Sequence, residues 1–285
     1  MDVKRSSQSS CHRRLVSPEV EEKIKYYQKQ GCIVPNRKLL KTPEQIDGIR
    51  ASSKINVAVL DYIAQNIRPG ITTAQIDRWV YQMTTDFGAL PAPLGYEGFP
   101  KSVCTSVNEV VCHGIPSKKE VLREGDIVNV DVSTLYKGYY SDSSRMFCIG
   151  EVPPEKKKLV EVTQECVELG LAQVKPWQFL GDMGEAVHRH AQTGGYSVVR
   201  EIGGHGIGLQ FHEEPWVSYV SRKGTGMLMV PGMVFTIEPM VNMGRAGVFV
   251  SASDGWTVYT ADRKPSAQWE ITVLVTEEGN EVLAW

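Results

Sequence analysis

The 285-residue sequence has little net charge, no long apolar run and no pair of cysteines at metal-binding spacing. A net charge of −2 does not favour a nucleic-acid-binding surface or an acidic binding tail. No apolar run approaches the ~20 residues that cross a membrane. Its six cysteines include no CxxC pair, which argues against a zinc finger and predicts free thiols in a reducing compartment. We therefore expect a cytoplasmic protein without nucleic-acid specificity or a membrane segment.

The start of the chain differs in composition from the rest. Residues 1–16 are basic and serine-rich but have no apolar segment, which predicts a disordered arm rather than a secretory signal. A charged helix is expected near 18–30. Thr42, Pro43 and Gln45 then form a capping box with proline at the first helical position. We thus expect an N-terminal extension over 1–41, of unexplained role, and one main domain over 42–285.

Within the main domain the order helix, helix, strands occurs twice. Pro69 and Pro176 are 107 positions apart (176 − 69), as are Gly88 and Gly195 (195 − 88), and residues 125–131 match 232–238 at the same offset. A constant offset indicates an internal duplication. It predicts pseudo-repeats at about 42–152 and 153–285, in which Asp131 and Glu238 end equivalent strands.

The segment NVDVSTLYKGYYSD at 129–142 reads as a hairpin. A two-residue turn at Lys137-Gly138 pairs the strands so that Asp142 lies opposite Ser133. Side chains alternate along a strand, so Asp131 and Asp142 lie diagonally on one face, roughly 7–8 Å apart at Cα. Two carboxylates this close repel each other unless a shared proton, an arginine or a metal neutralises them.

Three further residues complete a candidate cluster. Glu238 and Glu270 stand in the apolar strands VFTIEPM and AQWEITVLV, and His205 stands in GGHGIG, where Leu209 breaks the phosphate-binding GxGxxG pattern. A single carboxylate at a strand end is usually a solvated surface group, but buried carboxylates need partners. Four carboxylates balance the charge of two divalent cations, and oxygen-rich ligation with one nitrogen favours Co²⁺, Mn²⁺ or Fe²⁺ over structural zinc.

Two more histidines lie in Gly/Pro-containing loops beside these strands. His113 stands in CHGIP and His212 in FHEEP, and neither has the HExxH spacing of a zinc peptidase. A lone histidine is more often structural or on the surface, as we expect for His188 and His190 on a helix. Because His113 and His212 lie in such loops, both a functional and a structural role stay open for them.

Five separated motifs in this order resemble the type I methionine aminopeptidases of bacterial kind. They are GYEGFPKSVCTSVNEVVCHGIP, VNVDVS…YYSDSS, GGHGIGLQFHEEP, FTIEPM and AQWE, and the resemblance covers about 42–285. It implies an α+β pita-bread fold, with two pseudo-two-fold related halves, a central antiparallel sheet and helices on the outer face. The departures from the family pattern are Ser141, Trp177, Tyr219 and Ile271, and none of them removes a ligand.

The resemblance also implies roles for individual residues. The metal ligands fall on Asp131, Asp142, His205, Glu238 and Glu270. The catalytic residues fall on His113, His212 and Glu238. The substrate-binding residues fall on Tyr96, Phe99, Cys104, His113, Phe211, His212 and Trp256.

The function that the resemblance implies is removal of the N-terminal methionine from nascent proteins and peptides by hydrolysis with two divalent metal ions, favouring small second residues. The expected partners are nascent polypeptide N-termini with transient ribosome association, and the expected state is a monomer. One alternative is a proline-specific peptidase of the same fold, against which FPKSVCTSVNEVVCHGIP argues. Another is a catalytically inactive pita-bread binding module, although such modules lose ligands and this chain keeps all five.

Overall fold

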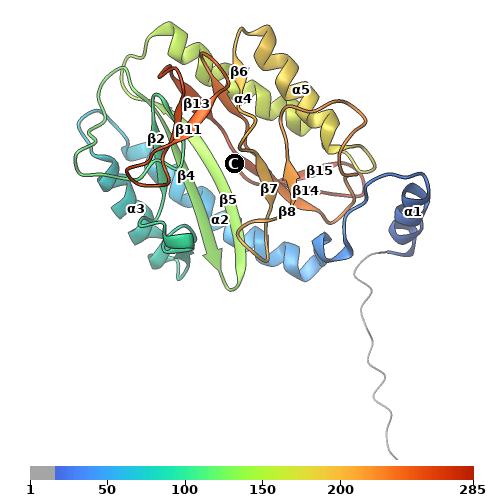
Figure 1. The fold of residues 1–285 in the computed structure, drawn as a ribbon. Coiled ribbons are helices and arrows are strands. Elements are labelled where there is room, and N and C mark those ends of the chain that lie inside the picture. The colour runs from blue at the N-terminus through green and yellow to red at the C-terminus, as the bar shows by residue number, and fades with distance from the viewer. Residues whose placement is uncertain (1–16) are drawn as a thin grey trace, which may run out of the picture.

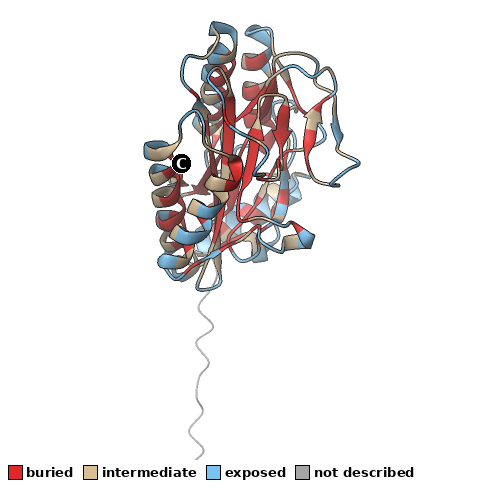
Figure 2. Ribbon diagram, turned by 90° about the vertical axis from the view of Figure 1, so that its left-hand side faces the viewer, coloured by how far each residue is buried: buried red, intermediate tan, exposed pale blue. Residues whose placement is uncertain are grey.

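The computed structural model describes residues 17–285, in which buried strands form a central layer beneath a face of helices (Figures 1 and 2). The helices are α1 (Pro18–Lys29), α2 (Pro43–Asn66), α3 (Thr73–Asp86), α4 (Pro154–Gln173) and α5 (Leu180–Thr193), with short 3₁₀ turns η1 (Arg37–Leu39) and η2 (Tyr96–Gly98). The predicted disorder of 1–16 lies outside the described residues.

The strands form four antiparallel groups. The first contains β1 (Leu90–Pro91), β2 (Cys104–Val107), β4 (Ile127–Tyr136) and β5 (Tyr139–Cys148). The second contains β7 (Gly204–Gly206), β8 (Glu213–Val217), β9 (Val234–Ile237), β14 (Ile271–Val275) and β15 (Asn280–Ala284). The two smaller groups are β6 (Ser197–Val198), β10 (Met240–Asn242) and β13 (Ser266–Gln268), and then β3 (Val110–Cys112), β11 (Val248–Val250) and β12 (Val258–Thr260).

The predicted helix start at Thr42 is confirmed. The Thr42 hydroxyl accepts the N–H of Gln45, and the Gln45 side chain accepts the N–H of Thr42, which satisfies two free donors at the start of α2. Thr72 holds the equivalent position before α3, where a threonine side chain could also cap the helix. The Thr72 side chain makes no capping bond there, and the N–H of Gln75 instead bonds to the Thr72 carbonyl.

The predicted hairpin register is confirmed. Tyr136 pairs with Tyr139, and Ser133 pairs with Asp142. Lys137 and Gly138 both have positive φ, 50° and 85°, which matches the type I′ turn that suits the right-handed twist of paired strands. This register places Asp131 opposite Ser144, so both aspartates face the same side of the strand pair.

The two halves of the chain repeat each other, and the predicted fold class is confirmed. Both ends of α5 lie 107 residues after the ends of α3 (180 − 73 and 193 − 86), and β9 begins 107 residues after β4 (234 − 127). The halves join where Ser144 and Glu270 exchange two backbone hydrogen bonds of 3.2 Å each. Ser144 lies opposite Asp131. Strand pairs on both sides of Glu238, Ile237 with Ile271 and Met240 with Gln268, place Glu270 opposite Glu238. Equivalent positions thus pair across the junction, as a pseudo-two-fold axis requires.

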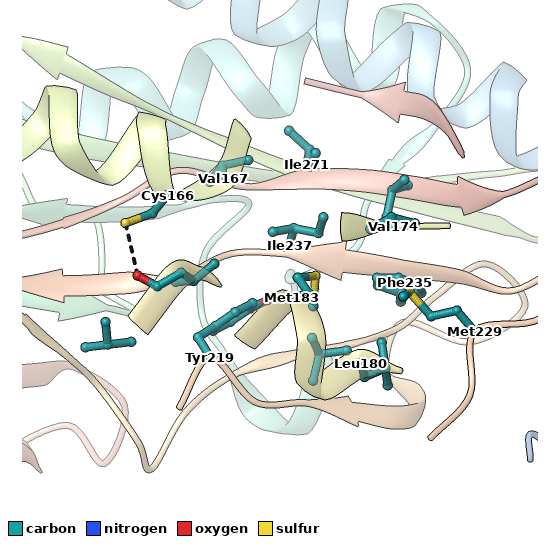
Figure 3. Packing of buried hydrophobic residues seen from close by; sticks show 14 of the residues in the cluster. Cys166, Val167, Val174, Leu180, Met183, Tyr219, Met229, Phe235, Ile237 and Ile271 are labelled. Carbon is teal, nitrogen blue, oxygen red and sulfur yellow. Dashed lines mark hydrogen bonds between the residues drawn. The ribbon is translucent and has the colours of Figure 1, made fainter. Parts of the chain in front are cut away.

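The largest apolar cluster lies between α4, α5 and the strands of the second half. Figure 3 shows Met183 of α5 beside Ile237 and Phe235 of β9, with Cys166 of α4 hydrogen-bonded to a backbone carbonyl. Helix α1 also belongs to this cluster through Val20 and Ile24. The predicted helix near 18–30 is therefore confirmed, and it packs against the body of the protein.

Candidate metal centre

Every residue that the sequence predicted for the site lines a single cavity of about 690 Å³. Asp131 and Asp142 come from β4 and β5, His205 from β7, and Glu238 and Glu270 lie just after β9 and just before β14. These strands meet at the junction of the two halves, so residues almost 140 positions apart in the chain (270 − 131) face the same space. Among the described residues that line this cavity, none is a lysine or arginine.

The imidazole of His205 faces the carboxylates with its free nitrogen. Its Nδ1 lies 2.9 Å from the carbonyl of Gly206, and since a carbonyl only accepts, Nδ1 carries the proton. Nε2 therefore has a free lone pair, and it lies 3.6 Å from Glu238 Oε1 and 3.9 Å from Asp142 Oδ2. Ligand atoms of Asp142, His205 and Glu270 all lie within 4.8 Å of one another. A metal ligated by His205 would find it already in the required tautomer.

Hydrogen bonds hold two of the carboxylates in place. Ser133 donates to Asp142 Oδ1 at 2.9 Å. Thr236 donates to Glu238 Oε1 at 2.7 Å, and Gln268 donates to Glu238 Oε2 at 3.1 Å. Sequence reasoning did not assign roles to these three residues. Two of them carried a signal, because Ser133 lies opposite Asp142 in the hairpin register and Thr236 shares a strand face with Glu238.

The pKa values of the four carboxyl groups are all raised, first by burial and, for three of the four, also by repulsion from neighbouring carboxylates. Burial raises the pKa of Asp131 to about 6 and that of Glu238 to about 8. Burial, followed by repulsion from the neighbouring carboxylates, raises the pKa values of Asp142 and Glu270 well above their ordinary range. Without a cation, the cluster therefore holds protons that isolated carboxyl groups would release at neutral pH.

These residues fit a divalent metal. Asp131 Oδ1 is buried without a hydrogen-bond partner, although a buried carboxylate oxygen normally has one. The candidate cluster offers four carboxylates and the neutral imidazole of His205, and no lysine or arginine among the described lining residues of the cavity can neutralise the carboxylates. A set dominated by oxygen with one nitrogen suits first-row divalent ions. A cation would satisfy the free oxygen and remove the repulsion between the carboxylates.

An aromatic wall borders the carboxylates. Phe211 contacts Tyr96 edge-on at 4.9 Å between ring centroids and stacks on His212 at 4.3 Å. Phe99 meets Trp256 edge-on at 5.2 Å, and Cys104 completes the apolar lining. An apolar, aromatic cavity beside a polar centre is typical of a pocket that binds an apolar side chain.

The two loop histidines lie at the border between the aromatic wall and the carboxylates. Burial, followed by the effect of His212, lowers the pKa of His113 to about 4, so it is neutral near pH 7. His212 Nδ1 lies 2.9 Å from the hydroxyl of Tyr96, and its ring is 4.3 Å from that of His205. Both histidines can therefore present a neutral N–H to a bound substrate.

Comparison with known proteins identifies the family. Residues 47–277 match the profile of metallopeptidase family M24, which is more than half of the chain. The chain belongs to metallopeptidase family M24. Within M24 the chain is 48% identical to "Methionine aminopeptidase A" of Synechocystis, over 84% of this chain and 94% of that protein. It is 44% identical to "Methionine aminopeptidase" of Escherichia coli K12, over 86% and 92%.

Solved structures support the same place within M24. The crystal structure of methionine aminopeptidase from Rickettsia prowazekii superposes with a TM-score of 0.85 at 43% identity, covering 86% of this chain and 99% of that one. The prolidase of Pyrococcus furiosus superposes with a TM-score of 0.69 at 22% identity, which shows a shared fold alone. The resemblance to type I methionine aminopeptidases is therefore confirmed.

The structure shows the surroundings of all four departures from the type I methionine aminopeptidase pattern. Tyr219 is buried, and its hydroxyl accepts the N–H of Glu238 at 2.7 Å. Trp177 adopts a positive φ of 69°, a conformation that favours the glycine usual in the family. Ser141 is buried with its hydroxyl 3.0 Å from that of Ser52, behind the site. Ile271 is fully buried in β14 opposite Ile237, where a charged side chain would lack partners.

Proposed function

We propose that this protein is a metal-dependent aminopeptidase that hydrolyses the bond after an N-terminal methionine. The observation that carries the proposal is that one cavity holds four carboxylates and one imidazole next to an aromatic wall. Its relatives at 43–48% identity are named methionine aminopeptidases. Because a peptidase of the same fold can have other substrates, the methionine specificity rests on these relatives and on the apolar pocket.

We propose two divalent ions, held by Asp131, Asp142, His205, Glu238 and Glu270. Four carboxylates balance four positive charges, and the set has enough oxygens for two ions. Two divalent ions would supply an activated water and a polarised scissile carbonyl. His205 breaks the duplication, because the residue 107 positions before it is Gly98 (205 − 107). One ion would thus have a nitrogen ligand and the other only oxygens, so their affinities should differ.

Proton transfer is assigned to Glu238. Its carboxylate faces the cavity among the other proposed ligands, where it could take a proton from water and return it to the leaving amine. Thr236 and Gln268 fix its two oxygens, so its carboxylate keeps one orientation during transfer. His113 and His212 would donate hydrogen bonds to the scissile carbonyl oxygen as negative charge develops on it.

The side chain of the substrate methionine would lie among Tyr96, Phe99, Cys104, Phe211 and Trp256. Aromatic rings and a sulfur neighbour suit a flexible, polarisable thioether. A preference for small second residues is proposed from the family resemblance. By the same reasoning we propose a monomer in the cytoplasm that acts on nascent N-termini with transient ribosome association, and a boundary near residue 42 between extension and catalytic domain. Among residues 17–285, no helix is long and apolar enough to cross a membrane.

Peptide hydrolysis tests the proposal directly. The protein is stripped of metal with a chelator, supplied with Co²⁺, Mn²⁺ or Fe²⁺ one at a time, and assayed with Met-Ala-Ser and Gly-Pro-Ala. Release of methionine only after metal is restored would support the proposal. Cleavage confined to the proline peptide would show a proline-specific peptidase, and cleavage of neither would favour a binding module.

A further inference from the structure

The loop that carries Phe211 and His212 is closed by one carboxylate. This substrate loop, residues 208–213, connects β7 to β8. Glu213 Oε1 accepts the N–H of Leu209 at 2.7 Å and the N–H of Gln210 at 2.9 Å. The two bonds fold the loop back on itself, so the positions of the Phe211 and His212 backbones depend on the position of this carboxylate.

The other oxygen of Glu213 pairs with Lys41, from the end of the N-terminal extension. Lys41 Nζ forms an ion pair with Glu213 Oε2, and the two side chains are only 1% and 9% exposed. A buried carboxylate that loses its cation must be hydrated or protonated, so each partner depends on the other. The Lys41 side chain also lies close to the loop backbone, because a Cβ built on Gly208 would lie 3.2 Å from Lys41 Cε and 2.5 Å from Ile49 Cδ1.

The backbone of Lys41 is itself fixed to the body of the protein. Its N–H donates to the carbonyl of Gly232 at 2.8 Å, and the preceding Leu40 forms a bridge with Met233. Gly232 and Met233 directly precede β9, the strand that leads to Glu238. The side chain of Lys41 therefore reaches the substrate loop from a backbone position that is hydrogen-bonded next to β9, the strand that leads to the proposed metal ligand Glu238.

The substrate loop has open space on two sides. One side is the 690 Å³ cavity of the candidate metal centre, and the other is a second cavity of about 490 Å³ against residues 38–40 of the extension. Gln210, Glu213 and Glu214 line both cavities. With cavities on both sides, packing alone restrains this part of the loop weakly, which increases the importance of the Lys41–Glu213 pair.

We propose that Lys41 is a positioning residue for the reaction, acting through Glu213 to hold Phe211 and His212 against the substrate. The inference rests on the proposed function, and it gives the end of the N-terminal extension a role in substrate binding. Lys41 does not itself line the 690 Å³ cavity, and the lining residue that it pairs with is Glu213, which is not one of the proposed metal ligands. Removing it should therefore disturb peptide hydrolysis while leaving metal binding intact.

The test compares Lys41→Met with the control Lys38→Met, which removes an exposed lysine three residues earlier. Hydrogen exchange of the Leu209 and Gln210 amides, metal titration and peptide kinetics are measured for each. Lys41→Met should accelerate exchange of both amides and lower kcat/KM for Met-Ala-Ser on the order of 10- to 100-fold, the range for a slightly misplaced substrate contact. Metal affinity should stay unchanged, and Lys38→Met should match the wild type.

Two double variants keep the test decisive if Lys41→Met fails to fold, because neither leaves an unpaired buried charge. Lys41→Met/Glu213→Gln retains an oxygen that can accept both loop amides, so it should restore slow exchange and most of the activity. Lys41→Met/Glu213→Leu removes that acceptor, so it should fold and bind metal but exchange fast and hydrolyse poorly.

Equal behaviour of the two double variants would overturn the inference, as would wild-type exchange and kinetics in a folded Lys41→Met. If the wild-type protein itself releases no methionine, the proposed function fails. The exchange rates still report whether Lys41 holds the loop, so the two failures are distinguishable.

Discussion

Replacing Asp142 with asparagine separates two effects of this carboxylate. In the metal-free protein it repels the neighbouring carboxylates, and in the metal-bound protein it would ligate a metal ion. Asp142 is buried, accepts a hydrogen bond from Ser133 and lies 3.9 Å from His205 Nε2. Asparagine has almost the same shape and keeps an oxygen that can accept from Ser133. The substitution thus removes one negative charge with little change in packing.

The expected effects have opposite signs in the two states. Burial and the charges of Asp131 and Glu238 raise the pKa of Asp142. At pH values above the ordinary carboxyl pKa, the ionisation of Asp142 therefore opposes folding of the metal-free protein. Without metal, Asp142→Asn should therefore unfold at a higher temperature than the wild type at pH 8. With metal, loss of a charged ligand should weaken binding at least about 100-fold, since even the outer partners of ligands contribute 10- to 100-fold. At saturating metal that loss removes about 2.7 kcal/mol of stabilisation.

Calorimetric titration of the chelator-treated protein with Mn²⁺, together with thermal unfolding in chelator and in excess Mn²⁺, measures both effects. Asp61→Asn is a suitable control, because that aspartate is 55% exposed on α2 and pairs with Arg145 away from the cavity lining. Unchanged stoichiometry and affinity in Asp142→Asn would show that Asp142 is not a ligand. A lower unfolding temperature in chelator would refute the repulsion argument.

Three further predictions address the same centre. His113→Asn, chosen because asparagine tolerates the positive φ of 55° at this position, should keep its metal and lower kcat more than it raises KM; a pure KM effect in steady-state kinetics would restrict His113 to substrate binding. In the metal-free protein the unfolding temperature should fall between pH 6 and pH 8, because the raised pKa values of Asp131, about 6, and Glu238, about 8, give the folded state extra protons that it loses over this range. Saturating Mn²⁺ should remove or reverse that slope in the same melting experiment. Tyr219→Phe should cost about 1–3 kcal/mol in urea unfolding, because the buried N–H of Glu238 loses its acceptor, and a stability equal to wild type would contradict that assignment.

Local chemistry in the sequence determined several elements without reference to the fold. The Lys137-Gly138 turn fixed the register of its hairpin, because two residues of positive φ allow only one close pairing of the flanking strands. Thr42, Pro43 and Gln45 fixed the start of α2, since all the groups of a capping box lie within four residues. The constant offset of 107 indicated two equivalent halves, and that signal needs no contact between them. The motifs indicated the proposed ligand set through their resemblance to type I methionine aminopeptidases.

The tertiary structure decided how the two halves share the carboxylates. Each half contributes two of the four acids, Asp131 and Asp142 from the first half and Glu238 and Glu270 from the second. The strand registers show that Asp131 and Glu238 are equivalent, whereas Glu270 is equivalent to Ser144. Gln268 is equivalent to Asp142, because it pairs with Met240 as Asp142 pairs with Ser133. The strand pairing is therefore symmetric, whereas the positions of the proposed ligands are not. Strand registers between distant segments depend on loop lengths, and the 126-residue separation of Ser144 and Glu270 (270 − 144) differs from the repeat offset.

The contact between Lys41 and Glu213 also depended on tertiary structure. The sequence places these residues 172 positions apart, and neither belongs to the site that the motifs predict. Their burial follows from the path of the extension, which packs Val20 and Ile24 into the main core and pairs Leu40 with Met233 before it enters α2. Hydrophobic patterning and turn chemistry are local, so the sequence alone determined elements and residue types. Which residues form a long-range ion pair, and which loop that pair holds in place, depend on how those elements pack.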